Sequence, residues 1–308
     1  MPEYDAVLLI TFGGPTSMDE VRPFLANVLR GRPVPPERIE EVVQHYEIIG
    51  GRSPLNELTQ RQADALRGRL ERYGLRLPVY VGMRNWHPYL RDTLADMQRD
   101  GVRRALGVIL AAQQSDAGWD RYQRDVADAR AALNGAAPPV GFIEGWHAHP
   151  LFIEAVADRA RGALAAVSPA RRAGVRLIFT AHSIPTAMAA GSPYEAQLHE
   201  GAALVARALG YSSYTLTYQS RSGNPREPWL EPDILTTVRE LAAGGARDLL
   251  VVPLGFVCDH VEVLYDLDVE AKQVAEAAGV DFIRAPAVND HPSFVRMLAE
   301  LVGTHVGR

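Results

Sequence analysis

Short apolar runs rich in β-branched residues alternate with helical patterns along this chain of 308 residues. Such alternation is typical of parallel sheets whose strands are joined by crossover helices. Eight runs are predicted to be strands, four in each half: Ala6–Phe12, Val79–Arg84, Ala105–Ala112, Val140–Trp146, Val175–Ala181, Tyr214–Gln219, Leu249–Val257 and Phe282–Ala287. The sequence therefore predicts an α/β fold with a four-stranded parallel sheet, flanked by helices, in each half.

The two halves resemble each other locally. Val7–Pro15 is similar to Arg176–Pro185, and His149 and His291 each open a helix, followed by proline, soon after the fourth strand of a half. The offset between matching segments varies along the chain, which indicates an ancient duplication and not a tandem array. We therefore expect two similar α/β units facing each other across a central cleft.

These repeats also suggest where the chain divides. We expect residues 1–148 to form an N-terminal half and residues 149–308 a C-terminal half, with terminal helices free to cross between them. The proline-rich stretch near residues 32–49 is predicted to be a lip inserted in the first half.

Composition excludes several classes of function. A net charge of −5 and the lack of a basic run argue against nucleic acid as a partner. The first residues lack a positively charged signal-peptide region, and no apolar run approaches the ~20 residues that span a bilayer. Cys258 is the single cysteine, which excludes an internal disulfide and a cysteine-ligated cluster within one chain. We expect a soluble, cytoplasmic protein without stable membrane insertion.

The segment after Leu249–Val257 carries an unusual density of carboxylates. If it is helical, Glu262, Asp266 and Glu270 lie at i, i+4 and i+8 and share one face. Like charges at this spacing destabilise an isolated helix by a few tenths of a kcal/mol per pair. The stripe is therefore either a solvated face or a site for a hard cation, and the helix alone leaves both readings open.

His182 is the second candidate for chemistry. It follows the first predicted strand of the second half, and Pro185 then begins a turn. An imidazole titrates near pH ~6.5, so His182 can accept a proton or bind a metal at neutral pH, although a lone strand-end histidine is more often a cap or a core residue. Glu262 follows another strand of the same predicted sheet, so we expect the two side chains to meet at one edge.

Other polar segments have structural explanations. We expect His260 to have a structural hydrogen-bonding role and Asp268, which lies off the stripe, to be solvated. Gly13-Gly14-Pro15 is not a dinucleotide-binding or P-loop pattern. Ser53 can cap the next helix or bind an anion, and residues 218–223 (YQSRSG) can frame a cleft.

Nine motifs in order along the chain resemble those of one family. They are LLITFGGP (8–15), NVLRGR (27–32), HYEIIGGRSPL (45–55), VYVGMRNWHP (79–88), FTAHSIP (179–185), PYEAQLHEGAALVA (193–206), YQSRSG (218–223), PWLEPD (228–233) and VVPLGFVCDHVEVLYDLDVE (251–270). The chain resembles the ferrochelatases, and most of all the coproporphyrin ferrochelatases of actinobacterial and firmicute type.

This resemblance implies a fold like that of the class II chelatases, with two Rossmann-like halves around a porphyrin-sized cleft. It implies a lyase of haem biosynthesis that inserts Fe2+ into coproporphyrin III and releases two pyrrole protons. By the family pattern, His182 and Glu262 are the catalytic, metal-binding pair, and Asp266 and Glu270 form an outer metal site. The implied metal is a substrate, and no organic cofactor is expected.

The resemblance also implies which residues contact the porphyrin. Tyr46, Ser53 and Tyr122 match positions that contact the macrocycle or its propionates, and His45 lies beside them. Phe12 stands where many relatives have a tyrosine opposite the histidine. Leu29 replaces an arginine of some relatives, and Arg30 lies next to it. We expect the substrate-binding residues to be these six: Phe12, Arg30, His45, Tyr46, Ser53 and Tyr122.

Two further expectations come from features in which this sequence departs from the family pattern. Trp119 stands where actinobacterial relatives carry a cluster-ligating cysteine, so no iron–sulfur cluster is predicted. The lack of an apolar membrane-binding lip favours the more polar coproporphyrin. Protoporphyrin IX remains the alternative substrate, and a cobalt or nickel tetrapyrrole chelatase and a non-catalytic porphyrin or haem carrier are further alternatives. Porphyrin and Fe2+ are the expected partners, with room for transient contacts to neighbouring haem-pathway enzymes.

Overall fold

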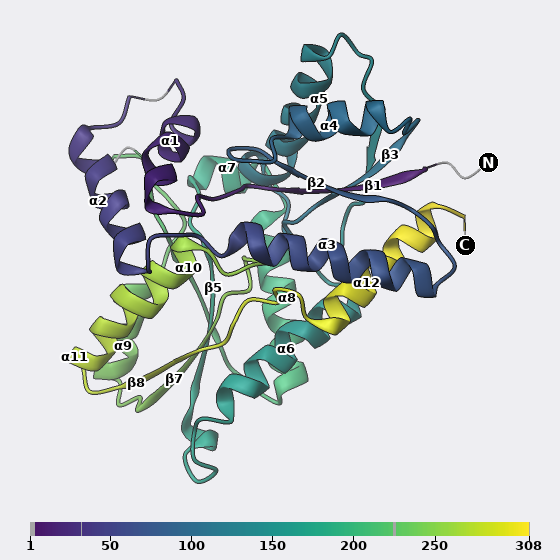
Figure 1. Cartoon of the computed structure of the whole chain (residues 1–308). Helices are drawn as coiled ribbons and strands as arrows, with labels where there is room; N and C mark the ends of the chain where they lie inside the picture. Colours follow the sequence, from purple (N-terminus) through teal and green to yellow (C-terminus); the bar gives the residue numbers. More distant parts are fainter. Residues whose placement is uncertain (1–3, 32, 224–225, 308) are drawn as a thin grey trace. The chain divides into compact units, whose positions relative to one another are not determined.

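The computed structural model describes residues 4–31, 33–223 and 226–307, which form two compact units (Figure 1). Unit 1 contains the described residues up to Ala111, Ala117–Glu144 and the described residues from Asp290 onward. Unit 2 contains Ala112–Asp116 and Gly145–Asn289. The last segment of the chain, which follows unit 2 in the sequence, thus belongs to unit 1.

Unit 1 is built on a parallel sheet in the order β2-β1-β3-β4. Its strands are β1 (Ala6–Thr11), β2 (Val79–Met83), β3 (Ala105–Ile109) and β4 (Val140–Phe142). All six residues of β1 are buried, as expected for a strand whose sheet is covered on both faces. β2, the next strand along the chain, pairs with one edge of β1, and β3 pairs with its other edge. The direction in which strands are added to the sheet therefore reverses between β1 and β3.

The helices of unit 1 are α1 (Met18–Val28), α2 (Pro36–Ile48), α3 (Leu55–Arg72), α4 (Leu90–Arg99), α5 (Arg121–Ala132) and α12 (Pro292–His305). A π-helical turn at Asp116–Asp120 precedes α5. Leu8 and Ile10 of β1 pack with Leu94 of α4 and Val126 of α5 in one apolar core. On another side α12 lies along α3 (Figure 1).

Unit 2 repeats the architecture with a parallel sheet in the order β6-β5-β7-β8. Its strands are β5 (Arg176–His182), β6 (Thr215–Gln219), β7 (Asp248–Val252) and β8 (Asp281–Arg284). Its α-helices are α6 (Pro150–Leu164), α7 (Thr186–Ala190), α8 (Tyr194–Leu209), α9 (Ile234–Ala243), α10 (Val261–Tyr265) and α11 (Lys272–Ala277). A π-helical turn at Asp266–Ala271 joins α10 to α11, and a 3-10 turn at Arg172–Gly174 precedes β5.

All eight predicted strands are present, and the prediction of two four-stranded parallel sheets is confirmed. The largest difference is β7, predicted to run to Val257 but ending at Val252. Pro253 follows directly and lacks the N–H that a ladder requires. The freed segment turns at once, with the Leu254 N–H donating to the Val252 carbonyl at 2.8 Å. This early turn decides where the acidic segment after β7 begins.

The segment predicted to be a lip near residues 32–49 contains α2 and the residues that precede it. Arg32 lies outside the described residues. Within the described chain, every helix is too short or too polar to cross a membrane.

Candidate active site

The carboxyl edge of the unit 2 sheet brings His182 and Glu262 together. His182 is the last residue of β5, and Glu262 lies in α10, after the neighbouring strand β7. The order β6-β5-β7-β8 reverses direction between β5 and β7, and parallel α/β sheets bind ligands at such a point because the connections leave on opposite sides. The two residues predicted to form a pair are therefore neighbours in the fold.

A glycine permits this approach. The Gly255 N–H donates to the Thr180 carbonyl at 3.0 Å, which holds the segment after β7 against the end of β5. A Cβ on Gly255 would lie 2.5 Å from the Cβ of Ala181, closer than side chains can pack. Only glycine fits here, and the close crossing delivers the start of α10 to His182.

The start of α10 is fixed by His260. Its side chain caps the helix, because Nδ1 accepts from the Glu262 N–H at 3.2 Å, and its ring packs edge-on against Phe256. Burial lowers the pKa of His260, which favours the neutral ring that a cap acceptor requires. His260 has the structural hydrogen-bonding role that the sequence favoured.

His182 and Glu262 form an ion pair with Nε2 and Oε1 3.6 Å apart. Nδ1 of the same ring faces the Ser183 carbonyl, so Nδ1 carries a proton and Nε2 is the nitrogen that gains or loses one. The Tyr194 hydroxyl donates to the His182 carbonyl at 3.0 Å and holds the backbone below the ring. The side chains of His182 and Glu262 are 31% and 40% exposed, which leaves both accessible to a ligand.

The pair is charged at neutral pH. Burial disfavours the imidazolium, but the Glu262 carboxylate outweighs it and raises the pKa of His182 well above its usual value. Burial likewise disfavours the carboxylate, but His182 outweighs it and lowers the pKa of Glu262. Each partner thus stabilises the other's charge.

Asp266 lies beside this pair and is held by residues from the end of β6. The Ser220 hydroxyl donates to Asp266 Oδ2, and the Gln219 amide donates to the Glu262 carbonyl at 2.7 Å. Ser220 adopts a left-handed backbone with φ of 60°, a strained conformation that often marks functional sites. Burial raises the pKa of Asp266 to about 7, and the negative charges of Glu262 and Glu270 add to the rise against the Ser220 hydrogen bond.

The acidic segment is not one continuous α-helix. α10 ends at Tyr265, and the wider π-helical turn Asp266–Ala271 carries both Asp266 and Glu270. The α-helical i, i+4, i+8 spacing is therefore interrupted at Asp266, where the π-helical turn begins. The negative charges of Glu262 and Glu270 still raise the pKa of Asp266. π-helical turns inside helices frequently occur at functional sites. Among the described residues, no three His, Cys, Asp or Glu side chains converge as a closed metal cage.

Asp268 is not simply solvated, so that prediction is wrong. Arg284 of β8 donates to both Asp268 oxygens, at 2.6 and 2.7 Å, and contacts Asp259 at 2.9 Å. Arg284 is 13% exposed, and its guanidinium links the residues before α10 to the π-helical turn. Its two partners flank Glu262 and Asp266 in the sequence, so this network holds the two ends of the acidic segment together.

The remaining predicted site residues belong to unit 1. Tyr46, Ser53 and Tyr122 are buried, and Tyr46 packs edge-on against Phe24. The Leu55 N–H donates to Ser53 Oγ at 3.3 Å, but Ser53 is not the cap of α3, because the N-cap position is Pro54. Their contact with substrate stays a prediction.

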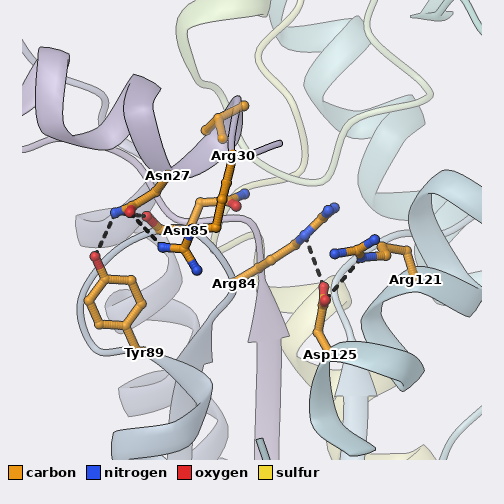
Figure 2. Close-up of a pocket in the computed structure, with 8 residues that line it drawn as sticks. Asn27, Arg30, Arg84, Asn85, Tyr89, Arg121 and Asp125 are labelled. Atoms are coloured by element: carbon orange, nitrogen blue, oxygen red, sulfur yellow. Dashed lines mark hydrogen bonds and ion pairs between the residues drawn. The ribbon is translucent and has the colours of Figure 1, made fainter. Parts of the chain in front are cut away.

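The exposed members of that set lie on different elements of unit 1. His45 is half-buried on α2, Arg30 is exposed after α1 (Figure 2), and Phe12 is 37% exposed at the end of β1. Trp119 is buried in the unit 1 core, and Cys258 is a buried free thiol.

Sequence reasoning assigned no contact with the pair to three supporting residues: Tyr194, Gln219 and Ser220. Gln219 and Ser220 stand at the end of β6 in the YQSRSG stretch, which was expected only to frame a cleft. Nothing local in the sequence pointed from Tyr194 to the carbonyl of His182.

Comparison with known proteins agrees with this geometry. The ferrochelatase family model matches residues 4–306. A coproporphyrin III ferrochelatase of Nocardia farcinica is 45% identical over 98% of this chain and 88% of its own length. A ferrochelatase of Rhodopirellula baltica is 44% identical over 100% of this chain and 88% of its own length.

Solved structures share the fold at low identity. SirB from Bacillus subtilis with Fe3+ aligns with a TM-score of 0.60 at 11% identity, over 98% of this chain and 95% of its own. The sirohydrochlorin chelatase SirB in complex with cobalt aligns with a TM-score of 0.57 at 10% identity, over 98% and 94%. The predicted chelatase-like fold is confirmed, and from the match across its length the chain belongs to the ferrochelatase family.

Proposed function

We propose that this protein inserts Fe2+ into coproporphyrin III, with His182 and Glu262 as the catalytic pair. The observation that carries the proposal is the opposed imidazole and carboxylate, 3.6 Å apart and accessible, at the carboxyl edge of the unit 2 sheet. Insertion requires a group that accepts pyrrole protons and a group that holds the metal loosely, and this pair supplies one of each.

In this proposal Nε2 of His182 accepts the two pyrrole protons one at a time and passes each to solvent. The Ser183 carbonyl fixes the other ring nitrogen as a donor, so a neutral ring has its lone pair on Nε2, the nitrogen that faces Glu262. His182 must first lose the proton that Glu262 stabilises. General bases of this kind contribute about 10²- to 10⁴-fold to the rate.

In this proposal, Fe2+ binding to Glu262 promotes the loss of the proton from His182. When Fe2+ binds its carboxylate, the negative charge that raises the pKa of His182 is neutralised, and the imidazolium becomes more acidic. The imidazole of His182 therefore becomes a neutral base once the metal is bound. A carboxylate is a suitable ligand because it binds Fe2+ without trapping it, as a thiolate set would.

Asp266 and Glu270 form the outer acidic site in this proposal. With its pKa raised to about 7, Asp266 is partly protonated near neutral pH, so a cation that approaches can displace its proton. The Ser220 hydroxyl keeps Asp266 oriented beside Glu262.

Coproporphyrin III is the proposed substrate because the relatives at 43–45% identity include many named coproporphyrin III ferrochelatases. Protoporphyrin IX is the competing substrate that the test must separate.

The test is anaerobic Fe2+ insertion, followed by the porphyrin absorption spectrum, with coproporphyrin III and protoporphyrin IX side by side. We expect coproporphyrin to be metallated faster, and His182→Ala and Glu262→Gln each to lower the rate by about 10²-fold or more. His305→Ala and Glu276→Gln remove the same kinds of group at positions that the proposal does not use and should retain the rate. Tight porphyrin binding without metallation, unchanged in both site variants, would make the protein a carrier and reject the proposal.

A further inference from the structure

The connection between β7 and α10 decides where Glu262 stands. Glu262 lies in the first turn of α10, and the N–H groups of a first turn lack partners within the helix. The connecting residues belong to no strand or helix, so their course is set by contacts with other segments. Gly255 anchors the first part of the connection on the end of β5. The second part, residues 257–259, has a different anchor.

Asn289 supplies this second anchor through three hydrogen bonds. Its N–H donates to the Val257 carbonyl at 2.9 Å. Its side-chain Oδ1 accepts from the Asp259 N–H at 2.9 Å, and its Nδ2 donates to Asp259 Oδ2 at 2.8 Å. Asn289 is 8% exposed and the Asp259 side chain 13%, so water competes little for these bonds. We call these three hydrogen bonds the Asn289 clamp, and it ends one residue before the helix cap His260.

Asn289 is itself held in place. The carbonyl of the buried Val288 accepts from Arg159 of α6 at 3.1 Å. Asn289 has a left-handed backbone with φ of 49°, a conformation that asparagine adopts more readily than most residues other than glycine. A side-chain amide also carries both an acceptor and a donor, and the clamp uses one of each. Glycine would fit the backbone but lack both groups, and aspartate would lack the donor.

The clamp differs from the contact that Arg284 makes with the same carboxylate. Arg284 donates to Asp259 Oδ1, whereas Asn289 donates to Asp259 Oδ2. Asn289 in addition contacts backbone groups of residues 257 and 259. It therefore fixes the course of the chain directly before His260, which the side-chain contact of Arg284 with Asp259 does not.

We infer that Asn289 is a positioning residue for Glu262. By holding residues 257–259, it fixes the start of α10, where His260 caps the helix. The start of α10 in turn sets the place of the Glu262 carboxylate opposite Nε2 of His182. A displacement of about 1 Å at a reacting group can lower a rate by about 10²-fold. The effect on the rate rests on the proposed function, whereas the clamp on residues 257–259 does not.

The test uses three variants and a matched control. Asn289→Gly keeps the left-handed backbone available and removes both side-chain hydrogen bonds. Asn289→Asp replaces the donor with a second carboxylate, and the double variant Asn289→Asp with Asp259→Asn restores a donor opposite an acceptor at the same place. Asn134→Gly is the control, because Asn134 is exposed, has φ of 53° and follows α5 in unit 1.

The first measurement is anaerobic Fe2+ insertion, at a temperature where thermal unfolding shows every variant to be folded. The kcat is expressed per porphyrin-binding site, counted by fluorescence titration, so a loss of folded protein does not count as a loss of rate. Asn289→Gly and Asn289→Asp should each lower kcat about tenfold or more and change the KM for coproporphyrin III less than about twofold. The double variant should recover kcat to within about threefold of the unsubstituted protein, and Asn134→Gly should leave it unchanged.

Hydrogen exchange supplies a second measurement that does not depend on insertion. The N–H groups of Glu262, Val263 and Leu264 all donate to His260, so their exchange reports how firmly the start of α10 is held. Asn289→Gly should speed the exchange of these three N–H groups about tenfold, and the control variant should not change it.

Three results would overturn the inference. They are an unchanged kcat in Asn289→Gly, a loss in Asn289→Asp that the double variant does not recover, and a loss in Asn134→Gly equal to that in Asn289→Gly. Failure of the unsubstituted protein to insert Fe2+ would instead reject the proposed function. The exchange measurement then decides the clamp alone: faster exchange in Asn289→Gly supports it, and unchanged exchange rejects it.

Discussion

Asp266→Asn should stabilise the protein, and by an amount that depends on pH. Burial and the neighbouring carboxylates raise the pKa of Asp266 from 3.8 to about 7 in the folded state. Between these values the folded chain binds a proton that the unfolded chain has lost, so the free energy of unfolding falls as pH rises. At about 1.36 kcal/mol per pH unit, the shifted carboxyl group lowers the free energy of unfolding by ~4 kcal/mol above pH 7, relative to a group with an unshifted pKa.

An asparagine avoids that cost, because it carries no charge and its oxygen can still accept from the Ser220 hydroxyl. The gain in the free energy of unfolding should approach ~4 kcal/mol at pH 8.5 and fall to ~1.5 kcal/mol at pH 5. Urea unfolding of both proteins at the two pH values measures it.

Asp268→Asn is the matched control, since it makes the same change two residues away but breaks the Arg284 ion pair. It should destabilise the protein at both pH values. A gain for Asp266→Asn that is the same at pH 5 and pH 8.5, or a loss at pH 8.5, would refute the assignment of a buried, hard-to-ionise carboxyl group.

Three other outcomes follow from the geometry. Glu262→Gln should lower the pKa of His182 from its raised value, because the largest opposing charge to burial is removed; NMR titration of the ring protons tests this, and an unchanged pKa would contradict the pairing. Arg284→Gln should cost about 3–5 kcal/mol in urea unfolding, because it leaves two carboxylates without their shared cation, and a cost below ~1 kcal/mol would show the network to be dispensable. Gly14→Ala should cost about 1–3 kcal/mol, because the new Cβ would lie 2.8 Å from the Cβ of Ser53, whereas an unchanged urea midpoint would show that this contact relaxes freely.

The strands and the pairing of His182 with Glu262 were predictable because both follow from periodic, local patterns. Eight apolar runs marked the strands, and parallel pairing placed the residues after β5 and β7 at one edge. The position of His182 relative to Glu262 therefore needed only the strand order and the rule that parallel strands end together.

What the sequence did not reveal depends on contacts between distant residues. The partner of Asp268 is Arg284, sixteen residues away on another element, so periodicity alone suggested a solvated carboxylate. The π-helical turn at Asp266–Ala271 changes the spacing of the carboxylates without any sequence marker. The charged state of His182 depends on a pKa that only the paired geometry sets.

The packing of α12 on α3 has a consequence for how the chain folds. Unit 1 is assembled from segments that precede and follow unit 2, so unit 2 is an insertion within it. During synthesis the whole of Gly145–Asn289 emerges before α12, and unit 2 has all its strands while α3 still lacks its neighbour. Phe294 and Leu298 of α12 are fully buried in the finished protein. Until they arrive, unit 1 of the nascent chain carries an uncovered apolar surface although unit 2 is already complete, and that surface is where chaperones or aggregation would act first.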